Sequence, residues 1–146
     1  MSLRGSIKAR IDDKGRLKLP TIFRAAVEQK HGTGLYITSL NSAGNHVRIY
    51  PLPVWEEIEA KLNAMSSTHP VRNKFLKVTS FYGQPADLDS QGRVLIHPRL
   101  RDTAAMVGDV DVVGALNHLQ VWNYERLLGE IQAEPLTDAE LGELPI

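Results

Sequence analysis

The sequence predicts an α+β protein built from two similar halves, and a repeated motif is the main reason. The motif Asp-x-x-Gly-Arg occurs at Asp12–Arg16 and again at Asp89–Arg93, once in each half of a chain of 146 residues. The similarity continues downstream, since Arg24 and Arg101 lie at the same offset from the two motifs. Strand-like and helix-like patterns also follow one another in the same order in both halves. We call the motifs the first and second box, and infer two copies of one unit packed together.

The first half has the periodicities of four strands and two helices. Arg16–Leu19 alternates basic with apolar side chains, as a half-buried strand does, and Pro20 suits the first turn of the helix that follows. That helix is predicted to end at Gly32 or Gly34. The second helix carries an apolar stripe made of Trp55, Ile58 and Leu62. The predicted strands are Ser6–Ile11, Arg16–Leu19, Leu35–Thr38 and Val47–Tyr50, with a loop at Ser39–Asn45 and helices opening at Pro20 and Pro53.

The second half repeats this order after a connecting segment. Met65–Pro70 has the composition of a linker, and a connecting helix that ends near Gly83 is predicted by Val71, Phe75 and Val78. Leu88 leads into the second box. The further elements are strands at Val94–Ile96, Val110–Val113 and Leu119–Trp122, a short helix from Pro98 that ends by Gly108, and a helix at Tyr124–Ile131. We divide the chain into a first repeat at 1–64, a connecting segment at 65–79, a second repeat at 80–134 and a loosely held acidic tail at 135–146.

Charge is unevenly distributed, although the formal net charge is zero. Residues 1–30 contain eight basic and three acidic side chains, whereas residues 125–146 contain six acidic and one basic side chain. A chain that is neutral overall can therefore present a positive face to phosphate. A solvated N-terminal segment is the alternative interpretation of the same charges.

Several function classes lack their usual signals in this sequence. The absence of cysteine excludes disulfides and cysteine metal sites, and the five histidines show no metal-ligand spacing. No Gly-rich phosphate loop or Gly-x-Ser-x-Gly occurs, and the paired carboxylates fall in turns or along strands. We therefore expect a protein that is not an enzyme, with no catalytic residue, metal, cofactor or small-molecule ligand. With no membrane span and no signal peptide, the expected location is cytoplasmic.

Within each box, the aspartate and the glycine have a structural explanation. Aspartate accepts hydrogen bonds from backbone N–H groups two or three residues ahead, and glycine adopts a left-handed backbone conformation. Together they predict a tight link between two strands. The arginine leaves from the strand end, where its guanidinium could grip a phosphate or a guanine edge. The alternative is a local ion pair that closes the turn, from Arg16 to Asp12 or Asp13, and from Arg93 to Asp89.

These motifs together resemble the MraZ family, over residues 3 to about 128. The resemblance rests on the two boxes in tandem, on Leu19-Pro20 after the first box, on Arg24 and Arg101, and on Tyr50-Pro51-Leu52-x-x-Trp55. MraZ proteins are bacterial transcriptional regulators of the AbrB-like swapped-hairpin class. The resemblance implies that the strands of the two halves interdigitate into one small β-barrel with flanking helices. It also implies that chains assemble into a homo-oligomeric ring.

The partner implied by the resemblance is double-stranded DNA. Family members bind short G-rich direct repeats upstream of the division and cell-wall genes, so the protein is expected to be associated with the nucleoid. Lys14, Arg16 and Arg93 match the positions that touch DNA, while Gln91 makes the second loop less basic. Basic residues of the first strand would neutralise phosphates, and we expect the first loop to dominate affinity. The predicted DNA-binding set is Arg4, Lys8, Lys14, Gly15, Arg16, Gln91, Gly92 and Arg93.

Departures from the family pattern leave one question open. The chain has Leu3-Arg4-Gly5 in place of Phe-Arg-Gly, His97 in place of a proline, and Phe81-Tyr82-Gly83 one residue closer to its box. These changes spare the binding positions but leave open how the second box is oriented relative to the first.

An alternative function is also open. The chain could be an antitoxin-like protein-interaction module without DNA readout, and the apolar stripe that contains Trp55 could then be the docking site for its partner.

Overall fold

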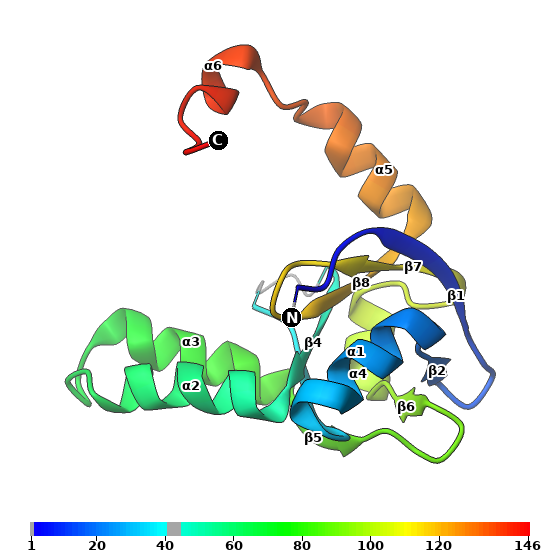
Figure 1. The fold of residues 1–146 in the computed structure, drawn as a ribbon. Coiled ribbons are helices and arrows are strands. Elements are labelled where there is room, and N and C mark those ends of the chain that lie inside the picture. Colours follow the sequence, from blue (N-terminus) through cyan, green and yellow to red (C-terminus); the bar gives the residue numbers. More distant parts are fainter. Residues whose placement is uncertain (1, 41–44) are drawn as a thin grey trace.

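A computed structural model describes residues 2–40 and 45–146, so residues 41–44 of the predicted loop Ser39–Asn45 lie outside the described residues. Within the described ranges the chain forms one eight-stranded antiparallel sheet. The sheet curls into a barrel around which the helices are placed (Figure 1). The predicted α+β barrel with flanking helices is therefore confirmed.

The first half follows the predicted order of elements. It contains β1 (Ser6–Ile11), β2 (Arg16–Lys18), α1 (Thr21–His31), β3 (Gly34–Thr38), β4 (Val47–Pro51) and α2 (Leu52–Asn63). Of the two glycines proposed to end the first helix, Gly32 does so, with a φ of 81°. A positive φ at a helix end favours glycine because a Cβ atom would be strained there.

The second half adds two elements that the sequence patterns do not predict. It contains α3 (Pro70–Phe81), β5 (Gln84–Asp87), β6 (Arg93–Leu95), α4 (Pro98–Thr103), β7 (Gly108–Gly114), β8 (Leu119–Asn123), α5 (Tyr124–Ala133) and α6 (Asp138–Leu141). β5 is not predicted because it contains Pro85, and proline, which cannot donate a ladder hydrogen bond, normally argues against a strand. In the tail, a capping box formed by Thr137 and Glu140 begins α6.

The strands of the two halves alternate in pairs around the barrel. Their order is β5-β3-β4-β8-β7-β1-β2-β6. The side-chain Nε2 of Gln84 in β5 donates to the carbonyl oxygen of Leu95 in β6 at 3.2 Å, which links the two ends of this order. If each strand of the first half is exchanged with its counterpart in the second (β1 with β5, β2 with β6, β3 with β7, β4 with β8), the order around the barrel is the same, read in the opposite direction. The chain therefore has an approximate two-fold axis, as two interdigitated copies of one unit require.

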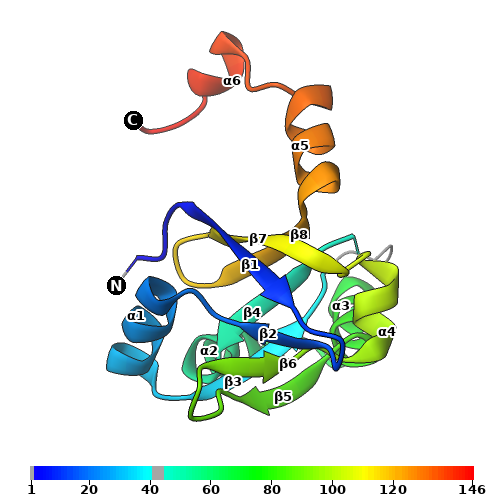
Figure 2. The ribbon, with the colours of Figure 1, turned by 90° about the vertical axis from the view of Figure 1, so that its right-hand side faces the viewer.

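The two strands that follow the boxes pair with each other, and we call this pair the box ribbon. β2 and β6 are antiparallel, with the partners Arg16↔Leu95, Leu17↔Val94 and Lys18↔Arg93. Leu19 N–H donates to the Gly92 oxygen and Ile96 N–H to the Gly15 oxygen, both at 2.9 Å. The two box loops consequently lie at opposite ends of one ribbon. Figure 2 shows α1 and α4 flanking this ribbon on its two sides.

Apolar side chains fill the barrel and the base of the α2–α3 pair. Leu17 and Val94 point from the box ribbon into the core, where they are almost fully buried. A second cluster surrounds Trp55, which is 4% exposed and stacks on Tyr36 with the ring centroids 4.7 Å apart. Phe75 of α3 packs against the same ring. Trp55 therefore belongs to the chain's own packing, which leaves no open docking stripe centred on this residue.

Candidate nucleic-acid interface

The first box forms a four-residue loop, Asp12–Gly15, between β1 and β2. Its ends are closed by a hydrogen bond from Asp12 N–H to the Arg16 oxygen at 2.9 Å, and Gly15 N–H donates to the Asp12 oxygen at 3.0 Å. The carboxylate of Asp12 accepts from the N–H groups of Lys14 and Arg16, at 3.0 and 2.8 Å. Gly15 has a φ of 83°. The predicted roles of the aspartate and the glycine in this turn are confirmed.

The second box forms the same loop, at the start of β6. Asp89 N–H donates to the Arg93 oxygen and Gly92 N–H to the Asp89 oxygen, each at 3.0 Å. The Asp89 carboxylate accepts from Gln91 N–H at 2.8 Å and from Arg93 N–H at 2.9 Å. Every hydrogen bond of the first loop therefore has its counterpart in the second. The shifted Phe81-Tyr82-Gly83 segment does not change this internal geometry.

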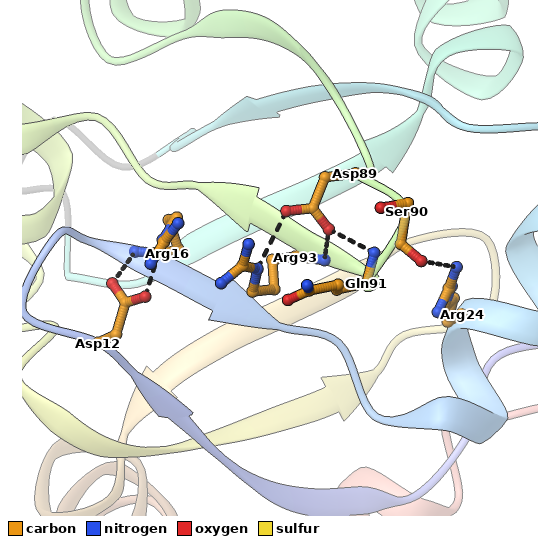
Figure 3. A network of polar contacts seen from close by, with 7 residues as sticks. All are labelled: Asp12, Arg16, Arg24, Asp89, Ser90, Gln91 and Arg93. Carbon is orange, nitrogen blue, oxygen red and sulfur yellow. Dashed lines mark hydrogen bonds and ion pairs between the residues drawn. The ribbon is translucent and has the colours of Figure 1, made fainter.

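Each box arginine forms an ion pair with the aspartate of its own loop. Arg16 Nε lies 2.8 Å from Asp12 Oδ2, and Arg93 Nε lies 3.0 Å from Asp89 Oδ2. Among the described residues, neither guanidinium makes a side-chain hydrogen bond through its Nη atoms. Both arginines are partly exposed, Arg16 to 34% and Arg93 to 27% of the side chain. The ion pair therefore orients each arginine while the Nη end, which forms bidentate contacts with phosphate or guanine, stays free (Figure 3).

The box aspartates remain ionised well below neutral pH. The hydrogen bond from Arg16 N–H lowers the pKa of Asp12, and the Arg16 guanidinium and Lys14 N–H lower it further. The N–H of Arg93 lowers the pKa of Asp89 in the same way. Because both carboxylates keep their charge, the two arginines are held in the same orientation across the physiological pH range.

Each half also places an arginine against the box of the other half. The guanidinium of Arg101 in α4 packs on Gly15, where a Cβ atom would collide with it, and that of Arg24 in α1 packs on Gly92 in the same manner. Arg24 Nη2 donates to the Ser90 oxygen at 3.2 Å, whereas Arg101 Nε donates to the Ile96 oxygen at 2.9 Å. The box glycines are therefore needed for this close approach as well as for the turn.

The two cross-half arginines differ in their charge environment. Arg24 Nε forms an ion pair with Glu28 at 3.1 Å. Among the described residues, Arg101 has no acidic partner. Sequence comparison of the two halves identifies both residues as equivalent, but assigns them no contact, because only the swapped topology brings each helix to the opposite loop.

Of the predicted basic residues on or near β1, none lies in either box loop. Arg4 precedes β1, at the end of the strand opposite the first loop. Because a six-residue strand spans roughly 17 Å, Arg4 lies at least that far along the chain direction from the loop. Lys8 is opposite Asp111 and lies 5.5 Å from the centre of the Tyr124 ring. Arg10 pairs with Asp109 at 3.2 Å. Lys14, Gly15, Arg16, Gln91, Gly92 and Arg93 do gather at the two ends of the box ribbon, whereas Arg4 does not join them.

One basic residue outside the predicted set lies between the loops. Lys18 is exposed on β2 and stands directly opposite Arg93 on β6. The alternation Arg16-Leu17-Lys18 already indicates that Arg16 and Lys18 share the outer face of a strand. The cross-strand position of Arg93, however, requires the pairing between the halves.

Among the residues 2–40 and 45–146, no cluster of three or more His, Cys, Asp or Glu side chains could hold a metal ion. In the same ranges, no helix has the length and apolar character needed to cross a membrane.

Comparisons with known proteins agree with the repeated boxes. The model of the MraZ protein family, described as antitoxin-like, matches residues 3–78 and 84–141. A protein of Koribacter versatilis named transcriptional regulator MraZ is 46% identical over 135 residues, covering 92% of this chain and 90% of the relative. Proteins of the same name from Acidobacterium capsulatum and Escherichia coli are 40% and 32% identical, and the alignments cover 92% and 96% of this chain and 90% and 94% of those relatives.

Proposed function

Since the chain belongs to the MraZ family, we propose that it is a sequence-specific DNA-binding transcriptional regulator that acts on promoter DNA at the nucleoid. Its target would be short direct repeats upstream of division and cell-wall genes. The observation that carries the proposal is the pair of loops with the same hydrogen bonds, each of which holds an arginine by Nε and leaves its Nη end free of contacts with the described residues. The names of the relatives support regulation of transcription as the role of this chain.

In this proposal, the loops bind DNA by separate contributions. Lys14 at the tip of the first loop would neutralise a phosphate, which makes binding weaken as salt rises. Arg16 and Arg93 would each form a bidentate contact with phosphate or with the O6 and N7 atoms of guanine. A good bidentate contact with guanine discriminates against other bases by roughly 1–3 kcal/mol. Asp12 and Asp89 do not touch DNA but hold the arginines in place, so little side-chain entropy is lost on binding.

A pair of short loops covers too little DNA for useful specificity, so we propose that several chains act together as a homo-oligomeric ring. Repeats bound by one ring are held at high effective concentration, which raises the overall affinity. An uncovered apolar surface supports self-association. No residue of α5 is buried within the chain, and α5 projects from the barrel (Figure 1). A hollow of about 290 Å³ beside it is lined by Val113, Leu127, Leu128 and Ile131, among others.

The test uses a duplex that contains the promoter repeats upstream of the chain's own operon. Fluorescence anisotropy at several salt concentrations should show tight, salt-sensitive binding that exceeds binding to a scrambled duplex. The variants Arg16→Ala and Arg93→Ala should each weaken it. Lys74→Glu, an exposed change on α3 away from the loops, serves as the matched surface control.

The opposite outcome would support the protein-interaction alternative. If the wild-type chain shows no repeat-dependent binding, or if both arginine variants bind like the wild type, direct DNA readout by these loops is wrong. An antitoxin-like interaction module would then be the better account, and the apolar surface along α5 would be the first place to look for its partner.

A further inference from the structure

We propose that Lys18 is a DNA-phosphate contact on the outer face of the box ribbon, opposite Arg93, which makes the two loops and the ribbon between them one continuous surface for a single duplex. The inference rests on the proposed function, since it concerns the same DNA. It adds a residue that belongs to neither box. It also supplies a positive charge next to the second loop, where Gln91 provides none.

The outer face of the box ribbon is built from alternating residues. Leu17 and Val94 point inward and are buried, so their neighbours along the two strands point outward. The outward residues are Arg16 and Lys18 on β2, and Arg93 and Leu95 on β6. Three of these four side chains are cationic, and Lys18 is the one of the three that belongs to neither box.

The pairing of Lys18 with Arg93 is unfavourable for the folded chain by itself. Hydrogen bonds join Leu19 to Gly92 and Ile96 to Gly15, and bonded and non-bonded pairs alternate in an antiparallel ladder. Lys18 and Arg93 therefore form a non-hydrogen-bonded pair, in which opposed side chains are closest and like charges repel. Asp89 offsets part of this repulsion through its ion pair with Arg93. A binding role would explain why a lysine occupies this position.

No acidic side chain compensates Lys18 within the described part of the chain. Its neighbours increase the positive charge instead, because Lys8 and Arg10 line one open hollow of about 310 Å³ together with it. Arg10 is paired with Asp109, and Lys8 lies over the Tyr124 ring. Lys18 is thus the cation in this hollow that is most available to an external anion.

The geometry of the loops places DNA over this lysine. From Gly15 to Leu19 the ribbon advances by four residues, or about 13 Å. A duplex carries one phosphate per 1.7 Å of its axis, so about 13 Å holds roughly seven or eight phosphates. A duplex that touches both loops must cross the outer face of the ribbon, and its backbone then passes within reach of the Lys18 ammonium group.

The experiment compares Lys18→Gln and Lys18→Glu with Lys74→Glu, a matched change on α3. Losing one phosphate contact per bound chain should weaken binding at 0.1 M salt by about 5- to 10-fold, and reduce the slope of log affinity against log salt by about 0.9, for each chain that contacts the duplex. The loss should be similar for the repeat-containing and the scrambled duplex, since phosphate contacts carry no sequence information. Lys18→Glu should also raise the thermal midpoint by about 1–3 °C, because it replaces a repulsive pair with an attractive one.

Weaker DNA binding by Lys18→Gln, which adds no negative charge beside Arg93, without a fall in the thermal midpoint is an outcome that a purely structural role cannot produce. If Lys18→Glu binds DNA like the wild type while Arg16→Ala does not, the DNA-binding function stands and the role of Lys18 is wrong. A lower thermal midpoint for Lys18→Glu would show that the lysine stabilises the fold, which also overturns the inference. If the wild-type chain itself shows no salt-sensitive binding, both this inference and the proposed function fail.

Discussion

The two box loops have the same internal geometry but different surroundings. In both, an aspartate accepts two backbone hydrogen bonds and pairs with the Nε of its arginine. The first loop carries Lys14 at its tip, whereas the second carries Gln91. The first is backed by Arg101, which lacks an acidic partner among the described residues, while the second is backed by Arg24, which is paired with Glu28.

This comparison separates what shapes a loop from what sets its affinity. The turn and the arginine orientation depend on residues that are identical in both copies, so duplication preserves them. The flanking charges have diverged, and they favour the first loop. The advantage should be limited, because Asp13 offsets part of the charge of Lys14, and Lys18 adds a cation next to Arg93. We therefore expect the first loop to contribute only a few-fold more to DNA affinity than the second.

The largest expected effect is the loss of a box arginine. Removing one good bidentate contact costs roughly 1–3 kcal/mol, or about 5- to 150-fold in affinity. Within that range we expect Arg16→Ala to weaken DNA binding by about 50-fold and Arg93→Ala by about 10-fold. Anisotropy titrations at one salt concentration measure both. Equal losses would mean that the flanking charges do not matter, and a larger loss for Arg93→Ala would reverse the comparison.

The smallest expected difference concerns folding stability at low pH, to which the two halves should contribute about equally. His46 stacks on Trp122 of the other half at 4.3 Å, and His118 stacks on Tyr50 at 4.7 Å. Burial lowers the pKa of each histidine to about 4, with Arg48 adding to the shift. The unfolded chain has ordinary histidines of pKa about 6.5, so between pH 6.5 and 4 it binds protons that the folded chain does not.

Stability is therefore complete above pH 6.5 and falls as the pH decreases towards 4, by up to about 1.4 kcal/mol per pH unit for each histidine. Urea unfolding at pH 7.5, 5.5 and 4.5 measures this slope. His46→Gln and His118→Gln should each remove about half of it. If one variant removes all of it and the other none, the symmetry of the two halves does not extend to this pair.

Local features of the fold were predictable because short-range physics determines them. Aspartate and glycine at fixed spacing specify the box turns, and the alternation in Arg16–Leu19 specifies a strand with its basic face outward. β5 was missed because Pro85 is an ordinary strand breaker, and α6 because a four-residue helix depends on one capping box. The sequence resemblance supplied the swapped arrangement, which the strand order confirms.

Contacts between the halves could not be predicted from sequence spacing alone. Arg24 and Arg101 are visible as equivalent residues, yet the box that each one covers depends on the crossing of the strands. Asn45-His46 and Asn117-His118 form a second repeat that the sequence patterns do not single out. Its role is visible only in the structure, where each asparagine contacts its histidine and each histidine ring stacks on an aromatic ring. The like-charge pair of Lys18 and Arg93 likewise exists only because β2 and β6 are neighbours.

The most direct test of the central claim exchanges the charges at the loop tips. The double variant Lys14→Gln, Gln91→Lys keeps both loop geometries and the net charge. DNA binding is then measured for this variant alone and with Arg16→Ala or Arg93→Ala added. If flanking charge sets the affinity of each loop, Arg93→Ala should now cost more than Arg16→Ala. If Arg16→Ala still costs more, the position of the first loop, and not its charge, makes it the stronger contact.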